Sequence, residues 1–293
     1  MNAILPAIRG RDLRQEGALP TFLIIGAMKC GTTSLHYYLS LHPEIGMSAE
    51  KELAFFVAKR NWHRGERWYR RQFDPAYGVR GEASPHYTCF SQFPDVPERM
   101  HALVPEARLI YLVRDPVDRL VSHYCHAVSM GREDRPLAEA VREPDSAYLA
   151  RSQYHCQIAR YLPYYGRDQI LVVDQDDLLR RRRATLGEVF AFVGADPDVW
   201  DPRFEWERHR TDRKRVKTAL GERVAASWPM RAIGRLPNRY RWPIEDAVYW
   251  PVSRPVERPV VSPGLRAEIA RRLEADVARW RAFTGRPFSH WSL

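Results

Sequence analysis

A lysine, two glycines and three hydroxyl side chains lie close together near the start of the chain, in the run Gly26-Ala27-Met28-Lys29-Cys30-Gly31-Thr32-Thr33-Ser34. A cation, hydroxyls and backbone N–H groups freed by glycine are the groups that bind phosphate or sulfate. The common nucleotide loop, G-x-x-x-x-G-K-[ST], has its lysine after the second glycine. Here Lys29 precedes Gly31, so the sequence predicts an anionic nucleotide site of another kind.

A second segment whose residues could bind a ligand is Arg114-Asp115-Pro116. It follows the apolar run Leu109-Ile110-Tyr111-Leu112-Val113. Ser122 lies two helical turns further on. An arginine fork with a hydroxyl suits a terminal phosphate dianion, and an Arg–Asp pair that caps the helix is the equal alternative. A phosphotransferase would use an aspartate here to hold Mg²⁺. Arg114 takes that place. Because Asp115 could still hold Mg²⁺, an ATP- and Mg²⁺-dependent phosphotransferase remains an alternative function.

The elements that position these groups follow from the hydrophobic pattern. Strands are predicted over 21–25, 79–84, 107–113 and 169–173, with a turn into a short strand over 42–47. Helices are predicted from 32 and 116, and over 62–73, 97–103, 152–164 and 186–193. This alternation predicts one α/β domain over 21–293 with a central, mainly parallel sheet flanked by helices, after an extension over 1–20. Lys29 and Arg114 both follow strands, where such sheets bind ligands.

The last part of the chain is rich in proline and tryptophan. We expect an irregular arm over 225–262, which either wraps the core or forms a lid or acceptor-binding arm. A helix is predicted over 263–284, with Ser262 as its N-cap and Gly285 beyond its end. Its expected buried stripe consists of Leu265, Ile269, Leu273, Val277 and Trp280.

Composition narrows the classes of partner. The net charge of +10 favours anionic partners, and a generally arginine-rich proteome explains it equally well. No nucleic-acid module is recognisable, so nucleic acid is not an expected partner. The four cysteines have no metal-ligand spacing and are expected to be reduced thiols in a cytoplasmic protein. No cleavable signal or transmembrane segment is predicted, and peripheral membrane contact and oligomeric state stay open.

Taken together, these segments resemble the PAPS-dependent sulfotransferases, in particular the branch of the heparan sulfate sulfotransferases and their bacterial relatives. PAPS is 3′-phosphoadenosine-5′-phosphosulfate. The resemblance is carried by 25–35, by Lys51-Glu52-Leu53-Ala54-Phe55-Phe56, by Gly81-Glu82-Ala83-Ser84-Pro85 and by 111–122. The segment 154–162 and the ending Thr284-Gly285-Arg286-Pro287-Phe288 also fit. The resemblance covers about residues 21–193 and the last predicted helix.

The resemblance implies a P-loop-like sulfotransferase fold and transfer of a sulfuryl group to a hydroxyl or amine of a glycan, glycolipid or small metabolite. Glu52 would be the general base and Lys29 would stabilise the leaving phosphate. The 5′-phosphosulfate would bind the loop residues Lys29, Cys30, Gly31, Thr32, Thr33 and Ser34. Arg114 and Ser122 would bind the 3′-phosphate, and Arg213, Lys214 and Arg215 would form a late cofactor loop. No metal is implied.

The chain departs from the heparan branch at Ala54, where that branch often has His, and at Ala83, where it often has Lys. The sequence motif of that branch's late cofactor loop is not recognisable, and the best counterpart is the run 210–217, which contains Arg213, Lys214 and Arg215. His86 or His123 is the fallback base if Glu52 does not serve. Besides the phosphotransferase, a non-catalytic module that binds anions or nucleic acid remains the alternative function.

Overall fold

Strand β1 (Phe22–Gly26) lies in the middle of a five-stranded parallel sheet, and all of its residues are buried. The structure is a computed structural model that describes residues 17–206, 215–233, 244 and 247–293. The strand order is β2-β3-β1-β4-β5. The other strands are β2 (Ile45–Met47), β3 (Val79–Ala83), β4 (Arg108–Val113) and β5 (Ile170–Asp174). The predicted mainly parallel sheet is confirmed.

The described residues form two compact units. Of the described residues, unit 1 comprises 17–114 and 154–206, and unit 2 comprises 115–153, 215–233, 244 and 247–293. The prediction of one domain over 21–293 stays a prediction.

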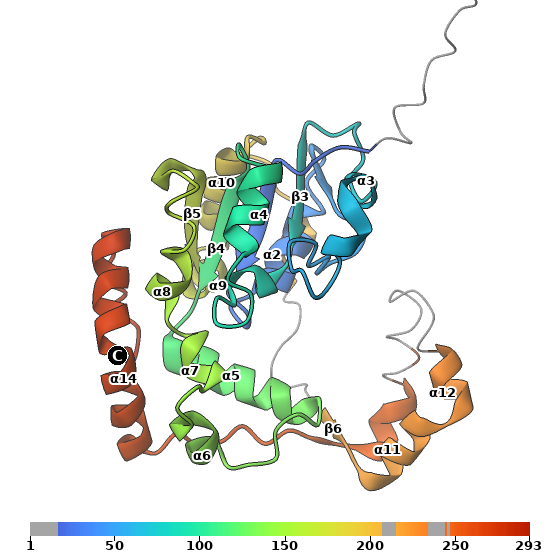
Figure 1. Cartoon of the computed structure of the whole chain (residues 1–293), viewed down its shortest axis with the longest axis vertical. Coiled ribbons are helices and arrows are strands. Elements are labelled where there is room, and N and C mark those ends of the chain that lie inside the picture. The colour runs from blue at the N-terminus through green and yellow to red at the C-terminus, as the bar shows by residue number, and fades with distance from the viewer. Residues whose placement is uncertain (1–16, 207–214, 234–243, 245–246) are drawn as a thin grey trace, which may run out of the picture. The chain divides into compact units, whose positions relative to one another are not determined.

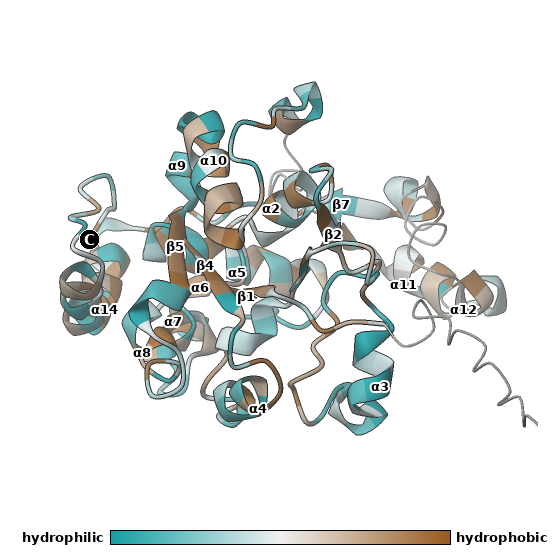
Figure 2. Ribbon diagram, turned by 90° about the horizontal axis from the view of Figure 1, so that it is seen from above, coloured by the Kyte–Doolittle hydropathy of each residue, from teal (hydrophilic) through white to brown (hydrophobic). Residues whose placement is uncertain are grey.

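Helices cover both faces of the sheet of unit 1, with α2, α9 and α10 on one face and α4 and α8 on the other (Figure 2). Figure 2 also shows the apolar character of β4 and β5, as expected for parallel strands that are covered on both faces. The helices of unit 1 are α2 (Thr32–Leu39), α3 (Gly65–Arg70), α4 (Val96–Leu103), α8 (Tyr154–Ile158), α9 (Gln175–Arg180) and α10 (Arg182–Val193). Its short 3₁₀ turns are Trp62–Arg64, Pro85–Thr88, Arg167–Gln169 and Pro202–Glu205.

The order of the strands creates a switch point beside β1 (Figure 1). From β1 the chain runs through α2 to β2 and β3 on one side, and then through α4 to β4 on the other side. Ligands of open α/β sheets bind at the carboxyl ends of the strands where the order reverses in this way. The Lys29 loop leaves β1 there, and Arg114 leaves β4.

Unit 2 is mainly helical. It consists of α5 (Pro116–Ser129), α6 (Leu137–Arg142), α7 (Ala147–Ala150), α11 (Ala219–Ala226), α12 (Trp228–Ile233), α14 (Pro263–Thr284), the 3₁₀ turn Trp250–Val252 and the antiparallel pair β6 (Arg215–Lys217) and β7 (Ser253–Pro255). Its core joins α5, α6 and α7 to α14 through residues such as Leu120, Val141, Leu149 and Ile269.

The last helix forms as predicted. The Ser262 hydroxyl accepts a hydrogen bond from the Leu265 N–H at 3.3 Å, and Gly285 ends the helix in the left-handed conformation with φ of 66°. The five residues of the predicted stripe are all buried. Both ends of α14 and its buried face could therefore be predicted from the sequence.

The helix predicted over 152–164 is much shorter in the structure. Helix α8 ends at Ile158, and turns follow up to the next strand. Pro163 has no N–H, and its ring would clash with the Ala159 carbonyl in a continued helix. The chain instead forms a tight turn in which the Tyr161 N–H donates to the Ile158 carbonyl at 2.9 Å.

The predicted irregular arm also contains a helix within its described part. Helix α12 starts at Trp228 and includes Pro229 in its first turn. The first N–H groups of a helix have no partner within it, so a proline is tolerated there.

Removing the cap of α14 tests how much this helix contributes. We expect Ser262→Ala to lower the free energy of unfolding by about 1 kcal/mol, since the Leu265 N–H loses its acceptor. Urea unfolding followed by circular dichroism measures the change. Ser262→Asp keeps an acceptor at the same place and is the matched control. Equal losses in both variants would contradict the capping role.

Candidate active site

The loop between β1 and α2 is the predicted anion site. Lys29 and Gly31 both have left-handed backbone conformations, with φ of 75° and 95°. Gly31 is the N-cap of α2 and has no side chain to cap it, and the first turn of this helix contains no acidic residue. The N-terminal end of α2 thus keeps the partial positive charge and the N–H donors that fit an anion. The side chains of Thr33 and Ser34 are half-buried, and that of Thr32 is buried.

Cys30 anchors this loop instead of facing outwards. Its side chain is fully buried, and its N–H donates to the Ala27 carbonyl at 3.2 Å. Its thiol lies 3.6 Å from the hydroxyl of Tyr154. The Ala27 N–H in turn donates to the Leu112 carbonyl of β4 at 2.7 Å. The loop is therefore tied to the neighbouring strand on its inner side.

Tyr154, at the start of α8, connects the loop to the other predicted anion ligand. Its hydroxyl donates to the Arg114 carbonyl at 2.8 Å and accepts from the Arg114 N–H at 3.3 Å. The same hydroxyl reaches Cys30, so one buried side chain holds both segments at the switch point. The sequence contained no signal for this contact beyond the position of Tyr154 within a segment of family resemblance.

The remaining predicted phosphate ligands lie in unit 2 or outside the described residues. Ser122 is buried on α5 of unit 2, so its pairing with Arg114 of unit 1 stays a prediction. Arg213 and Lys214 lie outside the described residues. Arg215 starts β6, where its guanidinium donates to the Ser253 hydroxyl at 2.8 Å and stacks on Trp250 at 4.3 Å.

Glu52, the predicted base, lies on the segment that follows β2. Its backbone is left-handed with φ of 65°, and its N–H donates to the Ala83 carbonyl at 2.9 Å. The carboxylate is about half exposed, and the Lys51 ammonium lies 2.6 Å from Oε1. A solvent-reachable carboxylate on a backbone that is held in an uncommon conformation is suited to meet a substrate.

His36 links the Glu52 segment to α2. Burial and the Lys51 ammonium lower the pKa of His36 to about 4, and the Glu52 carboxylate acts weakly in the opposite direction. His36, on α2, is therefore uncharged at neutral pH.

The two fallback bases lie in different units of the structure. His123 is buried in unit 2, and its Nδ1 lies 3.3 Å from the guanidinium of Arg119, which can only donate. His86 lies in the 3₁₀ turn Pro85–Thr88, with its ring beside that of Phe93.

Within the described ranges no group of three or more His, Cys, Asp and Glu side chains is arranged to hold a metal ion. A search of the same residues for a helix with the length and apolar character of a membrane span also found none.

Comparison with known proteins agrees with the sequence and the fold. The model of the sulfotransferase domain family matches residues 19–215. Human bifunctional heparan sulfate N-deacetylase/N-sulfotransferase 2 is 31% identical over 204 residues, which are 61% of this chain and 22% of that protein. Human heparan sulfate glucosamine 3-O-sulfotransferase 5 is 30% identical over 212 residues, covering 68% of this chain and 59% of its own. The chain thus spans less than two thirds of these relatives.

A solved structure is similar over nearly the whole chain. The sulfotransferase from Alicyclobacillus acidocaldarius superposes with a TM-score of 0.66 at 28% identity, covering 94% of this chain and all of that one.

The low pKa of His36 makes the stability of the protein depend on pH. Between pH 6.5 and about 4 the unfolded chain binds a proton that the folded chain does not, so stability falls as the pH is lowered through this range. We expect His36→Gln to remove up to about 3 kcal/mol of this fall, at about 1.4 kcal/mol for each unit of difference in pKa. Urea unfolding at pH 4.5 and 7 measures it. His63→Gln, at an exposed histidine, is the control, and an unchanged pH dependence in His36→Gln would contradict the assignment.

Proposed function

The chain belongs to the sulfotransferase domain family, and from this premise we propose that it transfers a sulfuryl group from PAPS to an acceptor hydroxyl or amine. The observation that supports this most is that the Glu52 N–H donates to the Ala83 carbonyl at the end of β3, the strand that pairs with β1 and therefore ends at the same edge of the sheet as the anion loop. A carboxylate and an anion-binding loop at one edge of a sheet are the two groups that proton removal and sulfuryl transfer require together.

Glu52 is the proposed general base. Its carboxylate takes the proton of the acceptor as the acceptor oxygen or nitrogen bonds to sulfur, and the bond from sulfur to the 5′-phosphate oxygen breaks. The electron pair of that bond stays on the phosphate, giving the sulfated acceptor and 3′,5′-ADP. The Lys29 ammonium and the N-terminal end of α2 stabilise the charge that grows on the leaving phosphate.

Arg114 and Ser122 are proposed to bind the 3′-phosphate of PAPS. A guanidinium can bind a phosphate dianion through two parallel N–H groups, which gives direction as well as strength. Tyr154 supports this role of Arg114, since its hydroxyl fixes both the N–H and the carbonyl of that residue. The late loop of Arg213, Lys214 and Arg215 is proposed to add positive charge to the same nucleotide.

A glycan is the proposed acceptor, with glycolipids and small hydroxylated metabolites as alternatives. The support is the likeness to two human proteins that are named for heparan sulfate, one an N-sulfotransferase and the other a 3-O-sulfotransferase. A cytoplasmic location is also proposed, supported by four cysteines of which none forms a disulfide within the described residues.

Nucleotide binding tests the donor. We expect 3′,5′-ADP to bind at least tenfold more tightly than 5′-ADP without Mg²⁺, because a charged hydrogen bond contributes about 1.5–3 kcal/mol. Arg114→Ala should remove this preference in titration calorimetry. Arg203→Ala changes a guanidinium that pairs with Asp201 and is the control.

Three results would count against the donor. Equal binding of 3′,5′-ADP and 5′-ADP would contradict the proposed 3′-phosphate site. A requirement for Mg²⁺ in nucleotide binding would favour the phosphotransferase. Tight, salt-sensitive binding without turnover favours a non-catalytic module.

Turnover tests the base. We expect Glu52→Gln to lower kcat by about 10²–10⁴-fold, as the loss of a general base does. The Kd of 3′,5′-ADP should stay within about twofold, because the change is confined to the base. The assay follows transfer of labelled sulfate from PAPS to desulfated heparin, and to water in its absence. Glu50→Gln, at an exposed neighbouring carboxylate, is the control. Full activity of Glu52→Gln would rule out its role.

A further inference from the structure

A buried carboxylate lies behind the segment that carries Glu52. Glu82, on β3, is completely buried. Its Oε1 accepts hydrogen bonds from the hydroxyls of Tyr69 at 2.6 Å and Tyr87 at 2.7 Å, and its Oε2 accepts one from the hydroxyl of Ser84 at 2.7 Å. Removal from water raises the pKa of Glu82, and the three hydroxyl donors oppose this. The pKa values of Tyr69 and Tyr87 are raised as well, so both hydroxyls keep the protons that they donate.

Two of the three donors also accept from the backbone that follows Glu52. The Ser84 hydroxyl oxygen accepts from the Ala54 N–H at 2.9 Å. The Tyr87 hydroxyl oxygen accepts from the Phe55 N–H at 3.0 Å. Each hydroxyl therefore relays a hydrogen bond from the peptide to the carboxylate, and the carboxylate determines which way both hydroxyls point.

The segment that donates these hydrogen bonds has an uncommon backbone conformation. Glu52 and Ala54 both have left-handed backbones, with φ of 65° and 46°, although neither is glycine. Such conformations persist where the surroundings over-determine them. The Leu53 carbonyl accepts from the Asn61 side chain at 2.7 Å, so the polar groups on either side of Ala54 are also fixed.

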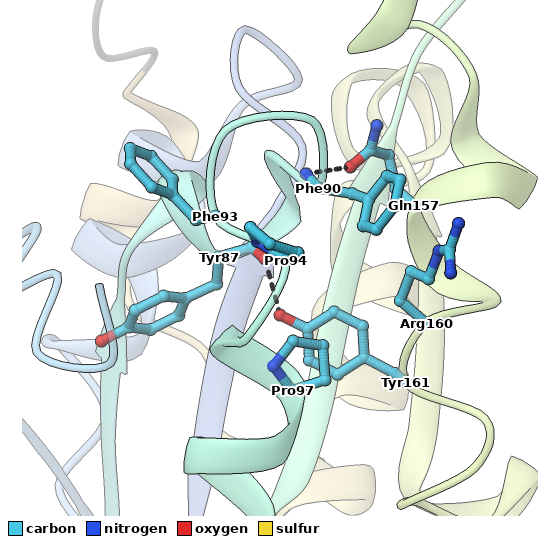
Figure 3. A pocket seen from close by; sticks show the side chains of 8 residues that line it. All are labelled: Tyr87, Phe90, Phe93, Pro94, Pro97, Gln157, Arg160 and Tyr161. Carbon is cyan, nitrogen blue, oxygen red and sulfur yellow. Dashed lines mark hydrogen bonds between the residues drawn. The ribbon is translucent and has the colours of Figure 1, made fainter. Parts of the chain in front are cut away.

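Tyr87 is itself anchored at both ends. Figure 3 shows its hydroxyl directed away from Gln157 and Tyr161, while its carbonyl accepts from the Tyr161 hydroxyl at 2.7 Å. Tyr161 is fully buried. The Tyr87 hydroxyl thus has little freedom to follow the segment if the segment moves.

We propose that Glu82, through Ser84 and Tyr87, is the positioning group that holds the Glu52 carboxylate in its working place. Glu82 touches no substrate in this role. The proposal rests on the function of Glu52 proposed above and extends it, since it names what fixes the base and not only the base.

The two tyrosines provide a matched pair of variants. Tyr69→Phe and Tyr87→Phe each remove one hydroxyl from the same carboxylate oxygen, and both keep their rings, including the stacking of Tyr69 on Phe55 at 4.1 Å. Only Tyr87→Phe also takes the acceptor from the Phe55 N–H. A general loss of stability should affect both variants alike, whereas loss of positioning should affect Tyr87→Phe alone.

We expect Tyr87→Phe to lower kcat by about tenfold or more, because a small misplacement of a reacting group costs up to about 10²-fold. Its KM for PAPS and its Kd for 3′,5′-ADP should stay within about twofold of the wild type, and Tyr69→Phe should stay within about twofold in all three. In the Glu52→Gln background Tyr87→Phe should have no further effect on kcat, since residues that act as one unit are not additive.

Amide hydrogen exchange gives a second readout that does not need turnover. The Phe55 amide should exchange at least tenfold faster in Tyr87→Phe than in Tyr69→Phe, and Ser84→Ala should do the same for the Ala54 amide. Equal exchange and equal kcat in the two tyrosine variants would overturn the inference while leaving Glu52 as the base. Full activity of Glu52→Gln would instead overturn the proposed function, and the exchange result would then decide alone whether Glu82 holds the segment.

Discussion

The parallel pairing of β1 with β3 on one side and β4 on the other is the constraint on which unit 1 depends. Parallel strands end at one edge of a sheet, so three sections of chain that are distant in sequence must meet there. They are the Lys29 loop after β1, Ser84 after β3 and Arg114 after β4. The sheet thus gathers a cation, a relay hydroxyl and a guanidinium without any local signal that would bring them together.

The features that the sequence predicted depend on residues close together in the chain, whereas most of those that it missed depend on residues far apart in the chain. The strand, loop and helix around Gly31, and the helix α14 with its cap and buried stripe, depend on neighbours in sequence and were predicted. The length of α8 was not, because its helical periodicity was followed past the point where Pro163 prevents a continuous helix. The roles of Tyr154 and Glu82 depend on partners up to 124 residues away or on burial, which a single sequence does not reveal.

Two non-glycine residues of the candidate site, Lys29 and Glu52, have left-handed backbones. Each costs about 1–2 kcal/mol relative to the right-handed form, and each lies on a turn that presents a charged side chain. The surrounding structure compensates differently in the two places. The Lys29 turn is tied to β4 by the Ala27 N–H, whereas the Glu52 turn is tied to a buried carboxylate through two hydroxyls.

The group of Glu82, Ser84, Tyr87 and Tyr69 has an evolutionary consequence. Each hydrogen bond in it joins two buried polar atoms, so changing one member alone leaves another without its partner, at a cost of about 1–3 kcal/mol. Intermediate sequences are therefore less fit than either end point, and these positions should drift as a block when relatives diverge. A relative that differs from this chain at one of these four positions should therefore also differ at the position that it bonds.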